Sequence, residues 1–183
     1  MQTVKEITKL IKQGKVIVCP TDTVYGLIAD ATNKKAVEKV FKIKKRSLKK
    51  PVPIFVKNIN QAKKLAKINK SQEKFLKVAW PGKVTVVLER KKSKIYGVDK
   101  KTIALRIPKY KLVNAILKET NLPLIGTSAN VSNNPFQTQI KKVISQLKKQ
   151  KYQPDLIVDA GDLKPSKPST VINIISPEPV ILR

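Results

Sequence analysis

The 183-residue sequence contains no histidine, and this absence narrows its chemistry more than any other feature. A Ser-His-Asp triad, a histidine general base and a histidine metal ligand are all excluded. The six glycines are spread along the chain, so they form neither a Walker A loop nor a G-x-G-x-x-G fingerprint. A nucleotide site in this chain would have to do without either glycine loop.

Long apolar runs and cysteines are also scarce. No run reaches about 18 apolar residues, the length that a transmembrane helix requires. The N-terminal residues lack the apolar core of a signal peptide. The single cysteine, Cys19, cannot form an internal disulfide, which is typical of a reducing cytoplasm. We therefore expect a cytoplasmic protein, and the length and the 41% apolar content predict one folded domain over residues 1–183.

Acidic residues are few, with 12 Asp and Glu against 39 Lys and Arg, and the net charge is +27. This balance favours polyanionic partners such as nucleic acid, nucleotides or anionic lipid. Nearly all of the charge is lysine, so solvated surfaces and a biased genome composition explain it equally well. The chain has only four arginines. Because lysine cannot bind phosphate or carboxylate through a planar pair of donors, these arginines are candidate anion ligands.

The most distinctive stretch runs over residues 16–27. A short apolar run predicts a buried strand that ends at Pro20, and four polar side chains follow at once: Thr21, Asp22, Thr23 and Tyr25. Strand ends that carry clustered polar groups are where open α/β sheets bind ligands. The alternative is an Asp-capped turn that leads into a helix.

The remaining periodicity predicts alternating helices and strands. Helices are expected over 2–13, 34–44, 59–68, 70–79, 110–120 and 139–149, and further strands over 52–56, 84–88, 102–108, 124–127, 156–159, 171–175 and 180–182. Residues 90–101 read as a polar, mobile connection in which Arg90 is a solvated charge. Thr102 and Arg106 share one strand face, which is either exposed to solvent or lines a pocket.

Six motifs together resemble the YrdC/TsaC family, the threonylcarbamoyl-AMP synthases, and they stand in the order of that family. They are Pro20-Thr-Asp-Thr-Val-Tyr-Gly-Leu27, Lys44-x-Arg46 with Pro51, Trp80-Pro-Gly82 with Thr85, Arg106-x-Pro108, Ser128-Ala-Asn130-x-Ser132 and Ser169-Thr-Val171. The resemblance covers the chain from about residue 5 to its end. It implies an α/β fold with a twisted, open mixed sheet, flanking helices and a basic concave cavity.

The resemblance also implies a reaction. L-threonine, bicarbonate and ATP, with magnesium, would give L-threonylcarbamoyladenylate and pyrophosphate in a nucleotidyltransferase step. Other proteins would then transfer the threonylcarbamoyl group to adenosine 37 of tRNA, and the basic surface could bind that tRNA directly.

Site residues follow by position in the motifs. Thr23, Arg106 and Ser169 resemble the threonine contacts of the family. The nucleotide contacts would be Arg46, Lys50, Thr102, Ser128 and Arg183, and the catalytic set would be Lys44, Arg46, Ser128 and Asn130. No protein metal ligands are implied.

Two departures leave alternatives open. Phe55 stands where the family usually has a histidine that contacts threonine, and Phe136 stands where a serine is common. A paralogue that acts on another carbamoyl or nucleotide substrate is therefore one alternative. A non-catalytic RNA-binding module is the other; the charge favours it, but aromatic residues for base stacking make up only 5% of the chain.

Overall fold

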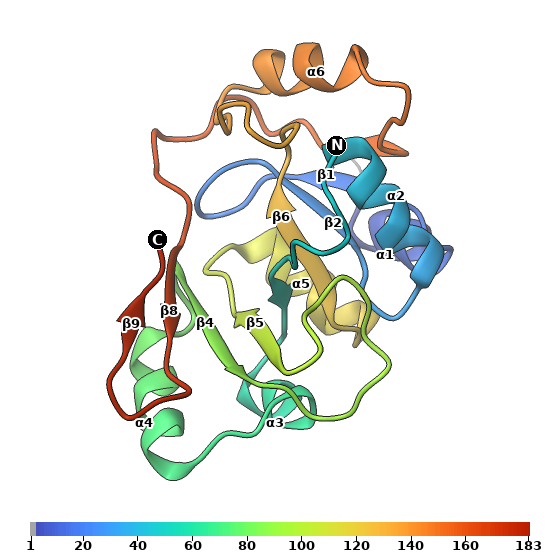
Figure 1. The fold of residues 1–183 in the computed structure, drawn as a ribbon. Coiled ribbons are helices and arrows are strands. Elements are labelled where there is room, and N and C mark those ends of the chain that lie inside the picture. The colour runs from blue at the N-terminus through green and yellow to red at the C-terminus, as the bar shows by residue number, and fades with distance from the viewer. Residues whose placement is uncertain (1–2) are drawn as a thin grey trace.

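The computed structural model describes residues 3–183, and their strands form one mixed sheet (Figure 1). The strands are β1 (Ile17–Cys19), β2 (Gly26–Asp30), β3 (Ile54–Phe55), β4 (Val84–Glu89), β5 (Thr102–Arg106), β6 (Leu124–Ser128), β7 (Leu156–Ile157), β8 (Thr170–Asn173) and β9 (Val180–Ile181). Their order across the sheet is β7-β1-β2-β6-β3-β5-β4-β8-β9. The predicted α/β fold with an open mixed sheet and flanking helices is confirmed.

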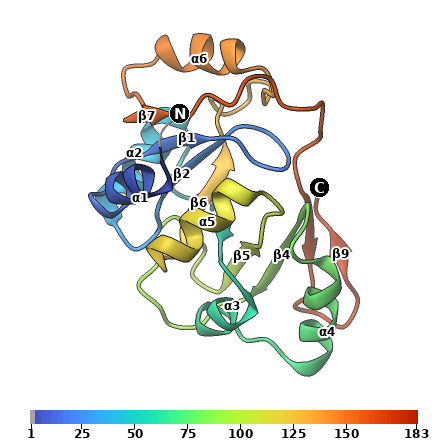
Figure 2. The ribbon, with the colours of Figure 1, turned by 180° about the vertical axis from the view of Figure 1, so that it is seen from behind.

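Helices cover both faces of this sheet. They are α1 (Val4–Lys12), α2 (Lys34–Lys44), α3 (Ile59–Leu65), α4 (Lys70–Ala79), α5 (Lys111–Thr120) and α6 (Ile140–Lys148). Helices α1 and α5 pack side by side over one face, where Ile7 and Ile116 join Ile17 and Ile28 in one apolar cluster (Figure 2). Helices α2 and α6 contribute to the cluster on the opposite side. No helix within residues 3–183 has the length and apolar character needed to cross a membrane.

Four helices begin at polar residues that cap their free backbone N–H groups. The side chain of Thr3 accepts from the backbone N–H of Glu6, and Asn33, Asn58 and Asn69 cap α2, α3 and α4 in the same way. At the other end of α2, Lys45 adopts a left-handed conformation with φ of 47°. The chain turns there, so Lys44 and Arg46 both reach the middle of the sheet.

Strand β2 is the main difference from the sequence prediction. The polar cluster after β1 does not lead into a helix; it forms the turn between β1 and the antiparallel strand β2. All five residues of β2 are buried, so the strand lacks the alternation that marks a half-exposed strand. The other elements lie where they are predicted, with ends that shift by up to three residues.

The connection over residues 91–101 also differs from expectation. The Arg90 guanidinium donates to the carbonyls of Ser93, Ile95 and Asp99, and the side chain of Ile95 is buried. Gly97 accepts from the backbone N–H of Val52. Arg90 therefore organises this loop, and its prediction as a solvated charge is wrong.

Candidate functional site

A polar cavity of about 200 Å³ opens over the middle of the sheet. Its walls come from the β1–β2 turn, the end of α2, the adjacent strands β6, β3 and β5, and the segment before β8. The lining includes Thr21, Thr23, Gly26, Lys44, Arg46, Phe55, Arg106, Gly126, Ser128, Asn130, Ser132, Asn133, Ser169 and Arg183. Residues from distant parts of the sequence thus meet at one place.

Lys44 ties the end of α2 to the loop after β6. Its Nζ donates to the carbonyls of Ser128 and Asn130, at 2.6 and 2.9 Å, and to Oδ1 of Asn130 at 3.0 Å. The residue is only 3% exposed. Burial and the nearby Arg46 lower the pKa of Lys44 to about 7, whereas its three acceptors favour the charged form.

Asn130 connects the members of this loop. Its Oδ1 accepts from the Ser128 hydroxyl at 2.6 Å as well as from Lys44, and its Nδ2 donates to the carbonyl of Asn134 at 2.6 Å. The Ser132 hydroxyl lies in the cavity lining and is buried without a partner in the described chain. The sequence motif contained Ser132, but no role was predicted for it.

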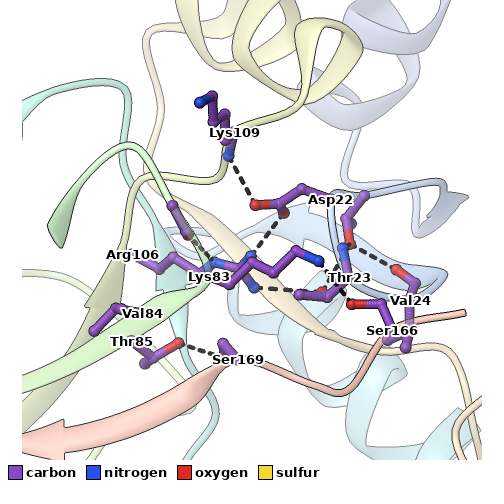
Figure 3. Close-up of polar contacts among 12 residues, drawn as sticks. Asp22, Thr23, Val24, Lys83, Val84, Thr85, Arg106, Lys109, Ser166 and Ser169 are labelled. Atoms are coloured by element: carbon purple, nitrogen blue, oxygen red, sulfur yellow. Dashed lines mark hydrogen bonds and ion pairs between the residues drawn. The ribbon is translucent and has the colours of Figure 1, made fainter. Parts of the chain in front are cut away.

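Arg106 stands on the β5 side of the cavity, where Asp22 holds it (Figure 3). Its Nη2 lies 2.7 Å from Oδ1 of Asp22, in an ion pair whose side chains are 4% and 8% exposed. Its Nε donates to the carbonyl of Gly82, and Nη1 lies 3.5 Å from the Thr23 hydroxyl. Burial lowers the pKa of Arg106 and the Asp22 carboxylate raises it, with the net shift downward.

The backbone N–H of Lys109 donates to the second oxygen of Asp22, so both carboxylate oxygens are used. The sequence places Asp22 in the polar cluster but predicts no partner for it. The ion pair spans 84 positions in the sequence, and local spacing carries no signal of it.

Ser169 lies at the segment before β8, next to the C-terminal residue. Its hydroxyl lies 2.8 Å from the hydroxyl of buried Thr85, and its carbonyl accepts from Nε and Nη2 of Arg183 (Figure 3 draws the Thr85 contact). Arg183 lines the same cavity as Arg46 and Arg106, and after burial, which is the larger cause, its charge adds to the lowering of the pKa of both. Arg46 donates to the carbonyls of Lys50 and Pro51 and thereby shapes the Lys-rich loop over residues 45–51 (the basic loop).

Eight of the ten predicted site residues line this cavity. Lys50 and Thr102 do not: Lys50 is exposed in the basic loop, and Thr102 lies at the far end of β5, where Asp99 caps it. The individual ligand roles of all ten residues stay predictions.

The cavity is cationic in its composition. Lys44, Arg46, Arg106 and Arg183 contribute to its lining, and no acidic residue does so within the part of the chain that the structure describes. Across residues 3–183, no cluster of three or more His, Cys, Asp or Glu side chains could hold a metal ion. The site is therefore suited to anionic groups such as phosphate and carboxylate, bound directly by cations, hydroxyls and amides.

Comparison with known proteins identifies the family of this chain. A model of the Sua5/YciO/YrdC family, described as telomere recombination, matches residues 9–183. A relative from Methanocaldococcus jannaschii is 37% identical over 169 residues, which cover 92% of this chain and 78% of the relative. The threonylcarbamoyl-AMP synthase of Bacillus subtilis is 32% identical over 98% of this chain and 52% of its own length.

The solved structure of Pyrococcus abyssi Sua5 in complex with L-threonine matches 98% of this chain with a TM-score of 0.88 and 31% identity. This chain covers 53% of that protein, and so spans about half the length of both the Bacillus and the Pyrococcus proteins. The family model covers nearly the full sequence, and the fold agrees with it, so this chain belongs to the Sua5/YciO/YrdC family.

Proposed function

We propose that this protein is a threonylcarbamoyl-AMP synthase, which forms L-threonylcarbamoyladenylate and pyrophosphate from L-threonine, bicarbonate and ATP. The observation that carries this proposal is the joint placement of Lys44, Arg46, Arg106 and Arg183 in one cavity with Ser128 and Asn130. Membership in a family that includes threonylcarbamoyl-AMP synthases, one of them solved with L-threonine, supports it.

The reaction joins two anions. The threonine amine attacks bicarbonate, and loss of water gives an N-carboxylate. An oxygen of this carboxylate then attacks the α-phosphorus of ATP, and the bond from that phosphorus to the β-phosphate oxygen breaks to release pyrophosphate. Repulsion between the carboxylate and the triphosphate is the main obstacle, so fixed positive charge and alignment supply most of the catalysis.

These tasks would be divided between the two sides of the cavity. Arg106, fixed by Asp22 and Gly82, would bind the carboxylate of threonine beside Thr23 and Ser169. Lys44, Arg46 and Arg183 would neutralise the phosphates, while Ser128 and Asn130 supply neutral hydrogen-bonding groups. The amine proton would leave to solvent or to a substrate oxygen, since no histidine is present.

Magnesium would enter as part of the ATP substrate. Hydroxyl, amide and cationic groups line the cavity. Among the described residues of the lining there is no carboxylate, the protein ligand that Mg²⁺ prefers. The phosphates and water would therefore carry the ion.

The product would pass to proteins that transfer the threonylcarbamoyl group to adenosine 37 of tRNA, in the compartment where ATP and tRNA are both present, the cytoplasm. The net charge of +27 favours direct contact with tRNA and is the observation behind the rival RNA-binding module.

Release of pyrophosphate by the purified protein tests the proposal. Release should require ATP, L-threonine and bicarbonate together, and the adenylate should appear by mass spectrometry in equal amount. Equal release without threonine would exclude this function, and RNA binding without any release would favour the rival module. Release with another amino acid but not with threonine would indicate a paralogue.

A further inference from the structure

One aromatic ring stands in the wall of this polar cavity. Phe55 lies on β3 between β6 and β5, pairs in register with Arg106, and is 3% exposed. Its ring lies against Gly126 of β6, so closely that a Cβ at position 126 would collide with three atoms of the ring. Glycine at this position therefore allows the ring to lie against the strand.

The same ring is a neighbour of the Arg106 guanidinium. The Arg106 Cζ atom lies 5.7 Å from the ring centroid, within the range of a cation–π contact. Within the described chain, Asp22, Gly82 and Thr23 contact three of the five N–H groups of Arg106. The other two N–H groups are left for a ligand. Arg106 cannot turn away from the ring without breaking the buried ion pair.

We propose that Phe55 sets the side-chain specificity of the amino-acid site through apolar contact with the threonine methyl group. The proposal rests on the function proposed above, in which Arg106 binds the substrate carboxylate. The carboxylate of an α-amino acid lies two bonds from Cβ, so a substrate held on Arg106 brings its β-substituents within reach of a ring 5.7 Å from that guanidinium. The hydroxyl can use the polar groups of the site, and the methyl group fits the ring.

Serine lacks this methyl group and is the informative competitor. Burial of one methylene-sized group against an apolar surface is worth about fourfold to tenfold in kcat/KM. Loss of the ring should remove most of this advantage and bring the two amino acids closer together. A role of Phe55 in packing alone would lower the two activities equally and leave their ratio unchanged.

The test measures the ratio of kcat/KM for L-threonine to that for L-serine, by pyrophosphate release at saturating ATP and bicarbonate. We expect a fall of about fivefold in Phe55→Ala and of at least about twofold in Phe55→Leu, which keeps an apolar side chain but not the flat ring. The matched control is Phe75→Ala, on α4 outside the cavity lining, whose ratio should equal that of the wild type.

The Phe55→Leu result decides the matter if Phe55→Ala does not fold, because Phe55 also packs in a buried cluster. An unchanged ratio in the folded Phe55 variants would overturn the proposal. So would a wild-type protein that uses serine as well as threonine. If the wild type releases no pyrophosphate with either amino acid, the proposed function itself fails, and this outcome is distinct because it appears before any variant is made.

Discussion

Asn130 holds together the side of the cavity that we propose binds the phosphates. Its side chain contacts Lys44, the Ser128 hydroxyl and the Asn134 carbonyl at once. An alanine at this position would leave the buried ammonium with two acceptors and would free the loop after β6. Ser128→Ala removes one of these contacts, whereas Asn130→Ala removes all three, so Asn130→Ala should be the more damaging variant.

We expect Asn130→Ala to lower kcat/KM for ATP about tenfold or more, since each buried polar contact is worth about 1 kcal/mol. Asn134→Ala is the matched control, because this exposed residue takes part in the loop through its backbone: its carbonyl accepts from Asn130 and its N–H donates to Val131. Steady-state kinetics at varied ATP checks both variants. Equal kinetics for Asn130→Ala and the wild type would mean that the loop forms a turn without contributing to catalysis.

Lys44 should make stability depend on pH in a predictable direction. Its pKa is about 7 in the folded protein and about 10.4 in an unfolded chain. Between these values the unfolded chain binds more protons than the folded one, so the free energy of unfolding rises with pH. Above the unfolded pKa, Lys44 is neutral in both states, and this gain in stability is complete. As the pH falls from there, the gain shrinks, and it is lost once the pH falls through 7 and folded Lys44 also becomes charged.

Comparison with Lys44→Met isolates this effect from the other lysines. The free energy of unfolding of the wild type, minus that of Lys44→Met, should increase from pH 7 to pH 9 in urea titrations. Methionine has a similar length and does not titrate, so it serves as the reference at every pH. A difference that stays flat over this range would show that the three acceptors hold Lys44 fully charged.

At the scale of elements, the loop over residues 91–101 depends on one arginine. Arg90→Lys keeps the charge but loses the planar fork that reaches three carbonyls. Loss of two of these contacts should lower the free energy of unfolding by about 1–3 kcal/mol, or the melting temperature by several degrees.

The expected effect of Arg90→Lys is on stability, whereas Arg106→Lys should act on binding. Arg106→Lys should raise KM for threonine about tenfold or more, because lysine cannot contact Asp22, Gly82 and a carboxylate together. Thermal melts and separate titrations of threonine and ATP distinguish the two effects. An Arg90→Lys protein with wild-type stability would refute the structural role of Arg90.

Sequence patterns located most elements because helices such as α2 and α5 present apolar residues at helical spacing to one side only. They did not locate β2, since a strand buried on both faces carries no alternation. Motifs identified Lys44, Ser128 and Asn130 as site residues. No sequence pattern indicated the Asp22–Arg106 ion pair or the contact between the Phe55 ring and Gly126. Those contacts join residues that are distant in sequence, and only the folding of the chain into the strand order β1-β2-β6-β3-β5 brings them together. The assignment of residues 1–183 to one domain stays a prediction.

The charge of the whole molecule should separate stability from substrate binding. With a net charge of +27, lysines repel one another across the surface of the folded protein, and salt screens this repulsion. The same ions compete with the triphosphate for Lys44, Arg46 and Arg183 in the cavity. Added salt should therefore stabilise the fold and weaken the binding of ATP.

We expect the melting temperature to rise between about 20 mM and 500 mM NaCl, and KM for ATP to rise over the same range, because about 10 Å of screening at 0.1 M shortens to a few ångströms near 1 M. Differential scanning fluorimetry and pyrophosphate release measure the two quantities in the same buffers. KM for threonine is the internal control: a zwitterion carries no net charge, so its dependence on salt should be much weaker.

A melting temperature that falls with salt would mean that ion pairs such as Asp155 with Lys39 outweigh the general repulsion. An unchanged KM for ATP would mean that the cationic side chains of the cavity do not contact the phosphates.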